Sequence, residues 1–152
     1  TFAAGCFWGV EELYRKQAGV YSTAVGYIGG HIDKPTYKQV CADTTGHAEA
    51  VQIHFNASEV SFETLLNIFW DNHNPTTLNR QGADKGSQYR SSIFYHSKEQ
   101  KSFAEKSKKN LDASERFSNP IVTEIVPVTT FYRAEEYHQK YLYKRGASSC
   151  SL

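Results

Sequence analysis

The sequence predicts an α+β protein in which helices and a sheet form a two-layer sandwich. Segments rich in β-forming residues are separated by segments whose apolar residues recur at helical spacing. Their order is strand, helix, strand, strand, helix, strand, followed by further elements. With 152 residues, 39% hydrophobic and 14% aromatic, the chain is long enough for one domain with a sizeable core.

The first three elements follow from the opening 30 residues. "TFAA" is a short apolar run typical of a buried strand. A helix follows, because three residues recur on one face: Val10, Leu13 and Tyr14. Gly19 ends this helix, and residues 20–30 ("VYSTAVGYIGG") form a strand that the double glycine stops.

Two long polar segments, residues 31–46 and 71–90, predict loops, and loops of such length in a compact domain are often functional. Between them, "EAVQIHFN" alternates like a half-buried strand. Ser61 is the expected N-cap of the clearest helix, whose apolar residues follow an i, i+3, i+4, i+7, i+8 pattern: Phe62, Leu65, Leu66, Phe69 and Trp70.

The last third adds a strand ("SSIFYH"), a lysine-rich helix, a strand ("PIVTEIVPV") and a final helix ("AEEYHQKYLYK"). The lysine-rich helix is anchored by Phe103, Ser107 and Leu111. The whole order is the split βαβ pattern of a ferredoxin-like sandwich with additional C-terminal helices. We expect one domain over residues 1–152, with a globular core of 1–144 and a flexible tail of 145–152.

Charge and cysteine content narrow the class of protein. The net charge is +1, which gives no electrostatic footprint for nucleic acid or an anionic membrane. No span or signal peptide is visible, so we expect a cytoplasmic protein, although Thr1 and the absence of Met leave open a removed targeting segment. Three widely spaced cysteines fit reactive thiols in a reducing compartment, and neither they nor the histidines show metal-ligand spacing. Nothing demands more than a monomer.

Cys6 is the main candidate for chemistry. It lies where the first strand gives way to the first helix, and a helix N-terminus favours a thiolate. Gly5 and Gly9 allow tight backbone geometry and close approach of a ligand. Phe7 and Trp8 are neighbours and point in different directions on a helix, so at least one of them forms an apolar wall beside the thiol.

Other candidates lie in the long loops and near the C-terminus. Glu49 enters the third strand, where an apolar thiol pocket would keep a carboxylic acid protonated as a proton donor. Tyr37, Asp84 and Tyr89 lie on the two loops and can converge on one thiol, and His138 can join them from the last helix. Cys150 in the tail can resolve an oxidised Cys6, and Cys41 is a second candidate for this role.

Five segments carry a family resemblance: "GCFWG" (5–9), "PTYKQVC" (35–41), "TGHAEAVQI" (45–53), "QGADKGSQYRS" (81–91) and "FYRAEEYHQKYL" (131–142). In order and spacing, over nearly the whole chain, they resemble the A-type peptide methionine sulfoxide reductases. The resemblance implies Cys6 as catalytic nucleophile and Glu49 as the acid that protonates the sulfoxide oxygen. It also implies substrate contacts: Tyr37 and Tyr89 to that oxygen, Phe7 and Trp8 to the methyl group, and Asp84 as an orienting group.

The implied activity is reduction of the S epimer of methionine sulfoxide, because each reductase class takes one epimer. The residue types suit this chemistry, since a sulfoxide sulfur is electrophilic only when its oxygen is protonated or strongly hydrogen-bonded. Cys6 would become a sulfenic acid, a resolving thiol would form a disulfide, and thioredoxin would reduce it, with no cofactor. The tail "KRGASSCSL" departs from the family pattern, so Cys150, glutathione or thioredoxin acting directly on Cys6 stay as alternatives.

Three other functions are compatible with parts of the sequence. A thiol redox sensor would use Cys6 and Cys150 without turnover, but it needs no acid or tyrosine donors. A binding module on the same scaffold would show a basic or exposed aromatic sheet face. A cysteine hydrolase would need a histidine or asparagine placed as its partner, and the sequence does not place one.

Overall fold

The computed structural model describes residues 1–147. In chain order its elements are β1 (Phe2–Ala4), α1 (Phe7–Arg15), β2 (Val20–Ile28), α2 (Tyr37–Cys41), β3 (Ala48–Phe55), α3 (Phe62–Asp71), β4 (Arg80–Gln81), β5 (Asp84–Lys85), the 3₁₀ turn η1 (Ser87–Tyr89), β6 (Ser91–Tyr95), α4 (Lys98–Ala113), β7 (Glu124–Pro127), β8 (Tyr132–Arg133), the 3₁₀ turn η2 (Glu136–His138) and α5 (Tyr141–Lys144).

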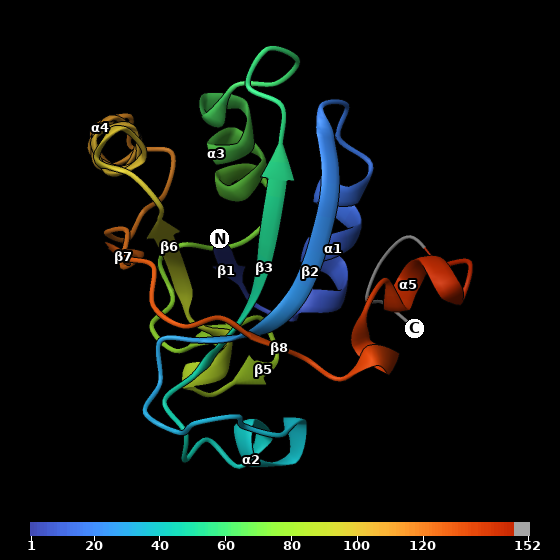
Figure 1. The fold of residues 1–152 in the computed structure, drawn as a ribbon. Helices are drawn as coiled ribbons and strands as arrows, with labels where there is room; N and C mark the ends of the chain where they lie inside the picture. Colours follow the sequence, from blue (N-terminus) through green and yellow to red (C-terminus); the bar gives the residue numbers. More distant parts are fainter. Residues whose placement is uncertain (148–152) are drawn as a thin grey trace.

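The main sheet has the order β7-β6-β1-β3-β2-β8, and its pairs are antiparallel except for β6 with β7. Its inner strands, β6-β1-β3-β2, with α1 and α3 as crossovers, have the predicted split βαβ arrangement, so the α+β fold class is confirmed. Figure 1 shows α1 behind β2 and α3 behind β3, on one face of the sheet.

Strand alternation divides the core between the two faces. Phe2 packs with the helices, in the cluster that holds Tyr14, Leu65 and Phe69, whereas its neighbour Ala3 belongs to a smaller cluster on the other face. The segment that runs from β7 to β8 packs against this second cluster and crosses the sheet in Figure 1. The helix α3 follows the prediction: Ser61 accepts a hydrogen bond from the Thr64 N–H at 3.1 Å.

Both predicted loops contain regular structure. Residues 31–46 include α2, whose N-cap Thr36 forms a capping box with Gln39. Residues 71–90 include the small β4–β5 ribbon and η1. The prediction of plain loops was therefore wrong at these short elements. In α2, the hydrogen bonds between the side chains and backbone of Thr36 and Gln39 stabilise the start of the helix.

Three further expectations needed correction. Leu13 is exposed, and α1 buries Glu11 and Glu12 instead, because these carboxylates find hydrogen-bond and ion-pair partners. Strand β7 is shorter than "PIVTEIVPV", and β8 was not expected. The predicted final helix is two pieces, η2 and α5, separated at Lys140. In residues 1–147, no helix is long and apolar enough to cross a bilayer.

Candidate active site

Cys6 is the residue at which β1 gives way to α1. The chain turns at Gly5, which has a φ of +93°, and the half-buried Cys6 then serves as N-cap of the helix. A side-chain Cβ on Gly5 would lie 2.7 Å from the Cγ of Gln81, so both the turn and the close approach require glycine. The thiol therefore stands at the positive end of the helix dipole, which favours a thiolate.

Glu49 reaches the same helix terminus from β3. Its side chain is 2% exposed, and Oε1 accepts a hydrogen bond from the Phe7 N–H at 3.3 Å. Tyr27 on β2 is paired with Glu49, so both side chains point to the sheet face that α1 covers. The structure thus brings a buried carboxyl group to the residue next to Cys6.

Tyr37 and Tyr89 come from the two polar segments and lie within reach of the charge of Glu49. Burial raises the pKa of both phenols above their ordinary value, and the Glu49 carboxyl, when it is ionised, raises each pKa further. A charge on Cys6 also contributes to the raised pKa of Tyr89. Both hydroxyls therefore stay protonated at neutral pH, and Tyr37 also hydrogen-bonds the Cys41 side chain.

Phe7 and Trp8 have different positions, as their adjacency on the helix predicts. Phe7 is 1% exposed, with its ring between those of Tyr27 and His138, so it belongs to the core. Trp8 is half-buried and held at two points. Its indole N–H donates to Nδ1 of His138 at 2.9 Å, and its ring stacks on Tyr141 with centroids 3.8 Å apart.

His138 is fully buried, and its ring centroid lies 4.3 Å from that of Tyr37. Burial lowers its pKa, while the charge of Glu135 acts in the opposite direction, so the ring is neutral near pH 7. Because Nδ1 accepts from Trp8, the proton of the neutral ring is on Nε2. Among residues 1–147, this Nε2 has no hydrogen-bond partner.

Glu135 is a site residue that the sequence reasoning missed. Its Oε1 accepts from the Tyr27 hydroxyl at 2.8 Å, and its Oε2 accepts from the Tyr37 N–H at 2.9 Å. Burial works to raise the pKa of this carboxyl, but these hydrogen bonds contribute to a net lowering. Glu135 stands three residues before His138 in the same motif, which was the available signal.

The other candidates lie further out or beyond the described residues. Asp84 is exposed, and its charge contributes to the raised pKa of Tyr89. The two loops are joined where Asp43 accepts hydrogen bonds from the N–H and hydroxyl of Ser87. Cys150 lies outside the described residues 1–147. Within those residues no cluster of three His, Cys, Asp or Glu side chains is arranged to hold a metal ion.

A thiol at a helix N-terminus, next to a buried carboxyl group and protonated tyrosines, is an arrangement that suits the chemistry of thiol-dependent enzymes. Residues 1–152 match the family model of peptide methionine sulfoxide reductase. The enzyme MsrA of Methanosarcina acetivorans is 61% identical over 96% of this chain and 78% of its own length. MsrA of Acidobacterium capsulatum is 57% identical over 100% of this chain and 97% of its own.

Solved structures agree with this assignment. Reduced Mxr1 from Saccharomyces cerevisiae superposes with a TM-score of 0.89 and 40% identity, covering 95% of this chain and 83% of its own. Methionine sulfoxide reductase A of Corynebacterium diphtheriae gives a TM-score of 0.87 and 34% identity, over 99% and 76%. The chain therefore belongs to the peptide methionine sulfoxide reductase family, and it is an oxidoreductase of the MsrA type.

Proposed function

We propose that this chain reduces the S epimer of free and protein-bound methionine sulfoxide through Cys6, as a protein-repair enzyme of the cytoplasm. One observation carries the mechanism. The Glu49 carboxyl accepts the N–H of the residue next to Cys6, and it lies near enough to Tyr37 and Tyr89 to raise the pKa of both hydroxyls when it is ionised. An acid and two donors are therefore near the thiol, as reduction of a sulfoxide requires.

In the reductive step, the Cys6 thiolate attacks the sulfoxide sulfur while protonated Glu49 gives its proton to the oxygen. Tyr37 and Tyr89 donate hydrogen bonds to that oxygen. The oxygen is transferred to Cys6, the S–O bond to the substrate breaks, and methionine leaves. The substrate sulfur is reduced by two electrons, and the Cys6 sulfur is oxidised by two electrons to sulfenic acid.

The other site residues would bind the substrate. Trp8 is the half-buried ring at the start of α1, and it forms the wall for the methyl group. The Nε2–H of His138 is a buried donor that a polar substrate atom or a water molecule would satisfy. Asp84 would orient the polar groups of the site from its exposed side, and its charge contributes to the raised pKa of Tyr89.

Recycling would form a disulfide between Cys6 and Cys150 with loss of water, and thioredoxin dithiol would reduce it. Support comes from α5, whose Tyr141 stacks on Trp8 and whose end binds the Ala147 N–H through the Leu142 carbonyl at 2.9 Å. Cys150 is three residues further along the chain, so the tail starts close to the site. No metal or organic cofactor takes part in these steps.

The test is a single-turnover reaction without external reductant. The protein is mixed with a peptide carrying one epimer of methionine sulfoxide, and methionine formed and thiols lost are counted. We expect about one methionine per chain from the S epimer, and two thiols lost as one disulfide forms. The Cys6→Ser variant should form no methionine from either epimer.

The other outcomes separate the alternatives. One methionine with one thiol lost would keep the reductase and remove Cys150 as the resolving residue. If the wild type loses two thiols and Cys150→Ser loses only one, Cys41 is excluded as the resolving residue. No methionine from either epimer, with Cys6 still reactive toward peroxide, would favour a redox sensor.

A further inference from the structure

The backbone makes a left-handed bend between η2 and α5. Lys140, at the bend, has φ +51° and ψ +40°, a conformation that a residue with a Cβ disfavours. His138, the last residue of η2, and Tyr141, the first residue of α5, flank this bend. Because both contact Trp8, the shape of the bend determines how the indole is held.

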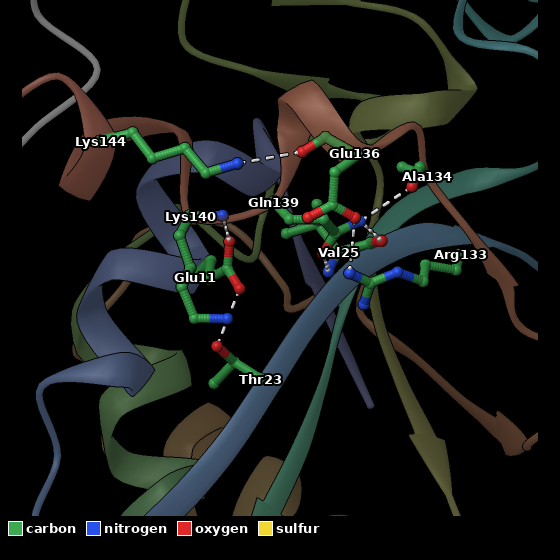
Figure 2. Close-up of polar contacts among 9 residues, drawn as sticks. All are labelled: Glu11, Thr23, Val25, Arg133, Ala134, Glu136, Gln139, Lys140 and Lys144. Atoms are coloured by element: carbon green, nitrogen blue, oxygen red, sulfur yellow. Dashed lines mark hydrogen bonds and ion pairs between the residues drawn. The ribbon is translucent and has the colours of Figure 1, made fainter.

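Two buried side chains fix the bend, as Figure 2 shows. Glu11 of α1 is 1% exposed, and its Oε1 accepts the Lys140 N–H at 2.6 Å while its Oε2 accepts the Thr23 hydroxyl at 2.8 Å. Gln139 pairs with β2 like a further strand residue. Its Oε1 accepts the Val25 N–H at 2.9 Å, and its Nε2 donates to the Val25 carbonyl at 2.9 Å.

Glu11 and Trp8 are three residues apart on α1, so they lie on neighbouring positions of one helix face. His138 and Tyr141 are likewise three residues apart, on either side of the bend. The helix thus binds the C-terminal segment at two points: the Glu11 carboxyl on Lys140, and the Trp8 ring between His138 and Tyr141. Because Glu11 and Trp8 belong to the same helix and contact the same short segment, a shift of the bend at Lys140 would also shift the indole of Trp8.

Burying a carboxyl group between a helix and a sheet costs free energy that burying an apolar side chain does not. A buried acid loses its hydration and is tolerated only when hydrogen bonds replace the lost water. At Glu11 both carboxyl oxygens accept hydrogen bonds. One of the two donors is the backbone N–H of Lys140, the residue in the unfavourable left-handed conformation. An apolar side chain would fill the same space without holding Lys140.

We propose that Glu11 is a positioning residue of the reductase: by holding the bend at Lys140 it sets His138 and Tyr141, and through them the Trp8 wall of the substrate pocket. The inference rests on the proposed role of Trp8 in substrate binding. Glu11 itself does not touch the reacting atoms.

The first test reads the indole directly and needs no activity. The chain has two tryptophans, so a ¹⁵N–¹H spectrum has two indole N–H signals, and Trp8→Phe identifies them. We expect Glu11→Ala to move the Trp8 signal and to speed its exchange with solvent about tenfold, because its hydrogen bond to His138 loosens. The Trp70 signal, whose N–H donates to Ser107, should not move and reports that the protein is folded.

Two variants serve as comparisons. Tyr14→Phe removes another buried hydrogen bond of α1, to the Leu65 carbonyl, and should leave the Trp8 signal in place. Glu11→Gln keeps an oxygen for the Lys140 N–H, so it should restore the wild-type signal. A Trp8 signal that is unchanged in Glu11→Ala, or that moves equally in Tyr14→Phe, would overturn the proposal.

Kinetics test the consequence for substrate. A displaced wall weakens a contact made equally in the bound substrate and the transition state, so Glu11→Ala should raise KM about tenfold with kcat little changed. Adding Lys140→Gly, which removes the penalty of the left-handed bend, should recover part of this loss. A fall in kcat without a change in KM, or no recovery, would contradict the route through the bend. Failure of the reductase function itself would instead abolish turnover in every variant while leaving the indole result intact.

Discussion

Glu49 occupies a place where a carboxyl group can both orient and react. One oxygen accepts the Phe7 N–H, which ties it to the start of α1, and the side chain is buried on the face that Tyr27 shares. The hydrogen bond fixes position, whereas proton donation needs an acidic O–H. These two properties separate in the amide of glutamine, which keeps an acceptor oxygen and lacks the acidic proton.

Glu49→Gln should therefore slow the reductive step much more than it weakens binding. General acid catalysis contributes about 10²–10⁴ in rate, so we expect a loss of that order in the single-turnover rate and little change in substrate affinity. Rapid-quench measurement of methionine formation checks this. Glu59→Gln, an exposed glutamate after the far end of β3, is the matched control and should react like the wild type. An unchanged rate in Glu49→Gln would remove it from proton transfer.

The helix α2 is the element that carries Tyr37, and its attachment is concentrated at its first residue. Glu135 accepts the Tyr37 N–H and the Tyr27 hydroxyl, and thereby joins α2 to β2 and to the segment that ends in His138. A five-residue helix has little stability of its own, so its position depends on such contacts.

Glu135→Ala should release α2 while the sheet stays intact. We expect the amides of residues 37–41 to exchange about tenfold faster with solvent and those of β2 and β3 to stay protected. Hydrogen exchange followed by mass spectrometry checks this. Glu136→Ala removes a neighbouring exposed carboxylate paired with Arg133 and should change neither region. Equal exchange in both variants would show that α2 is held by other contacts.

At the scale of the whole molecule, elements with a local signal could be predicted and those set by distant partners could not. The apolar repeat of α3 and its Ser61 cap are local, and both are present. In contrast, "EEYHQKYL" is compatible with a continuous helix, and the break at Lys140 arises where Gln139 pairs with Val25 on β2 and Glu11 accepts the Lys140 N–H. The capping box of Thr36 was a local signal for α2 that went unused.

The same distinction holds for the site. The position of Cys6 at a strand-to-helix turn predicted a helix N-terminus, which the structure has. The placement of Glu49 beside it depends on β3 lying next to β1, which no local pattern states. Glu11 and Glu135 were missed because a carboxylate near aromatic residues gives no sign in sequence of the backbone N–H groups that it will accept.

A half-buried histidine, His73, links helix α3 to strand β6, away from the thiol. The Nδ1–H of His73 donates to the Phe69 carbonyl at 2.6 Å in α3, and Nε2 accepts from Ser91 of β6 at 2.7 Å. The Ser91 hydroxyl also meets that of Thr123, before β7, at 2.7 Å. Protonation of Nε2 would make the ring a donor at both nitrogens, so the Ser91 hydroxyl would have to turn and accept from the ring, and a charge would be placed in a site with little water.

The stability of the protein should consequently fall in mild acid. Burial lowers the pKa of His73 from 6.5 to about 4, with the Phe69 carbonyl acting the other way. Between these values the unfolded chain binds a proton that the folded chain does not, so the stabilisation is complete above pH 6.5 and is lost as the pH falls toward 4. The loss is at most about 3 kcal/mol. Urea unfolding from pH 4 to 8 measures this loss.

The free energy of unfolding of His73→Gln should decline less steeply with falling pH than that of the wild type. His54→Gln, at an exposed position, should show the same decline as the wild type. Parallel pH profiles for His73→Gln and the wild type would mean that other groups, such as the paired carboxylates, govern the acid sensitivity.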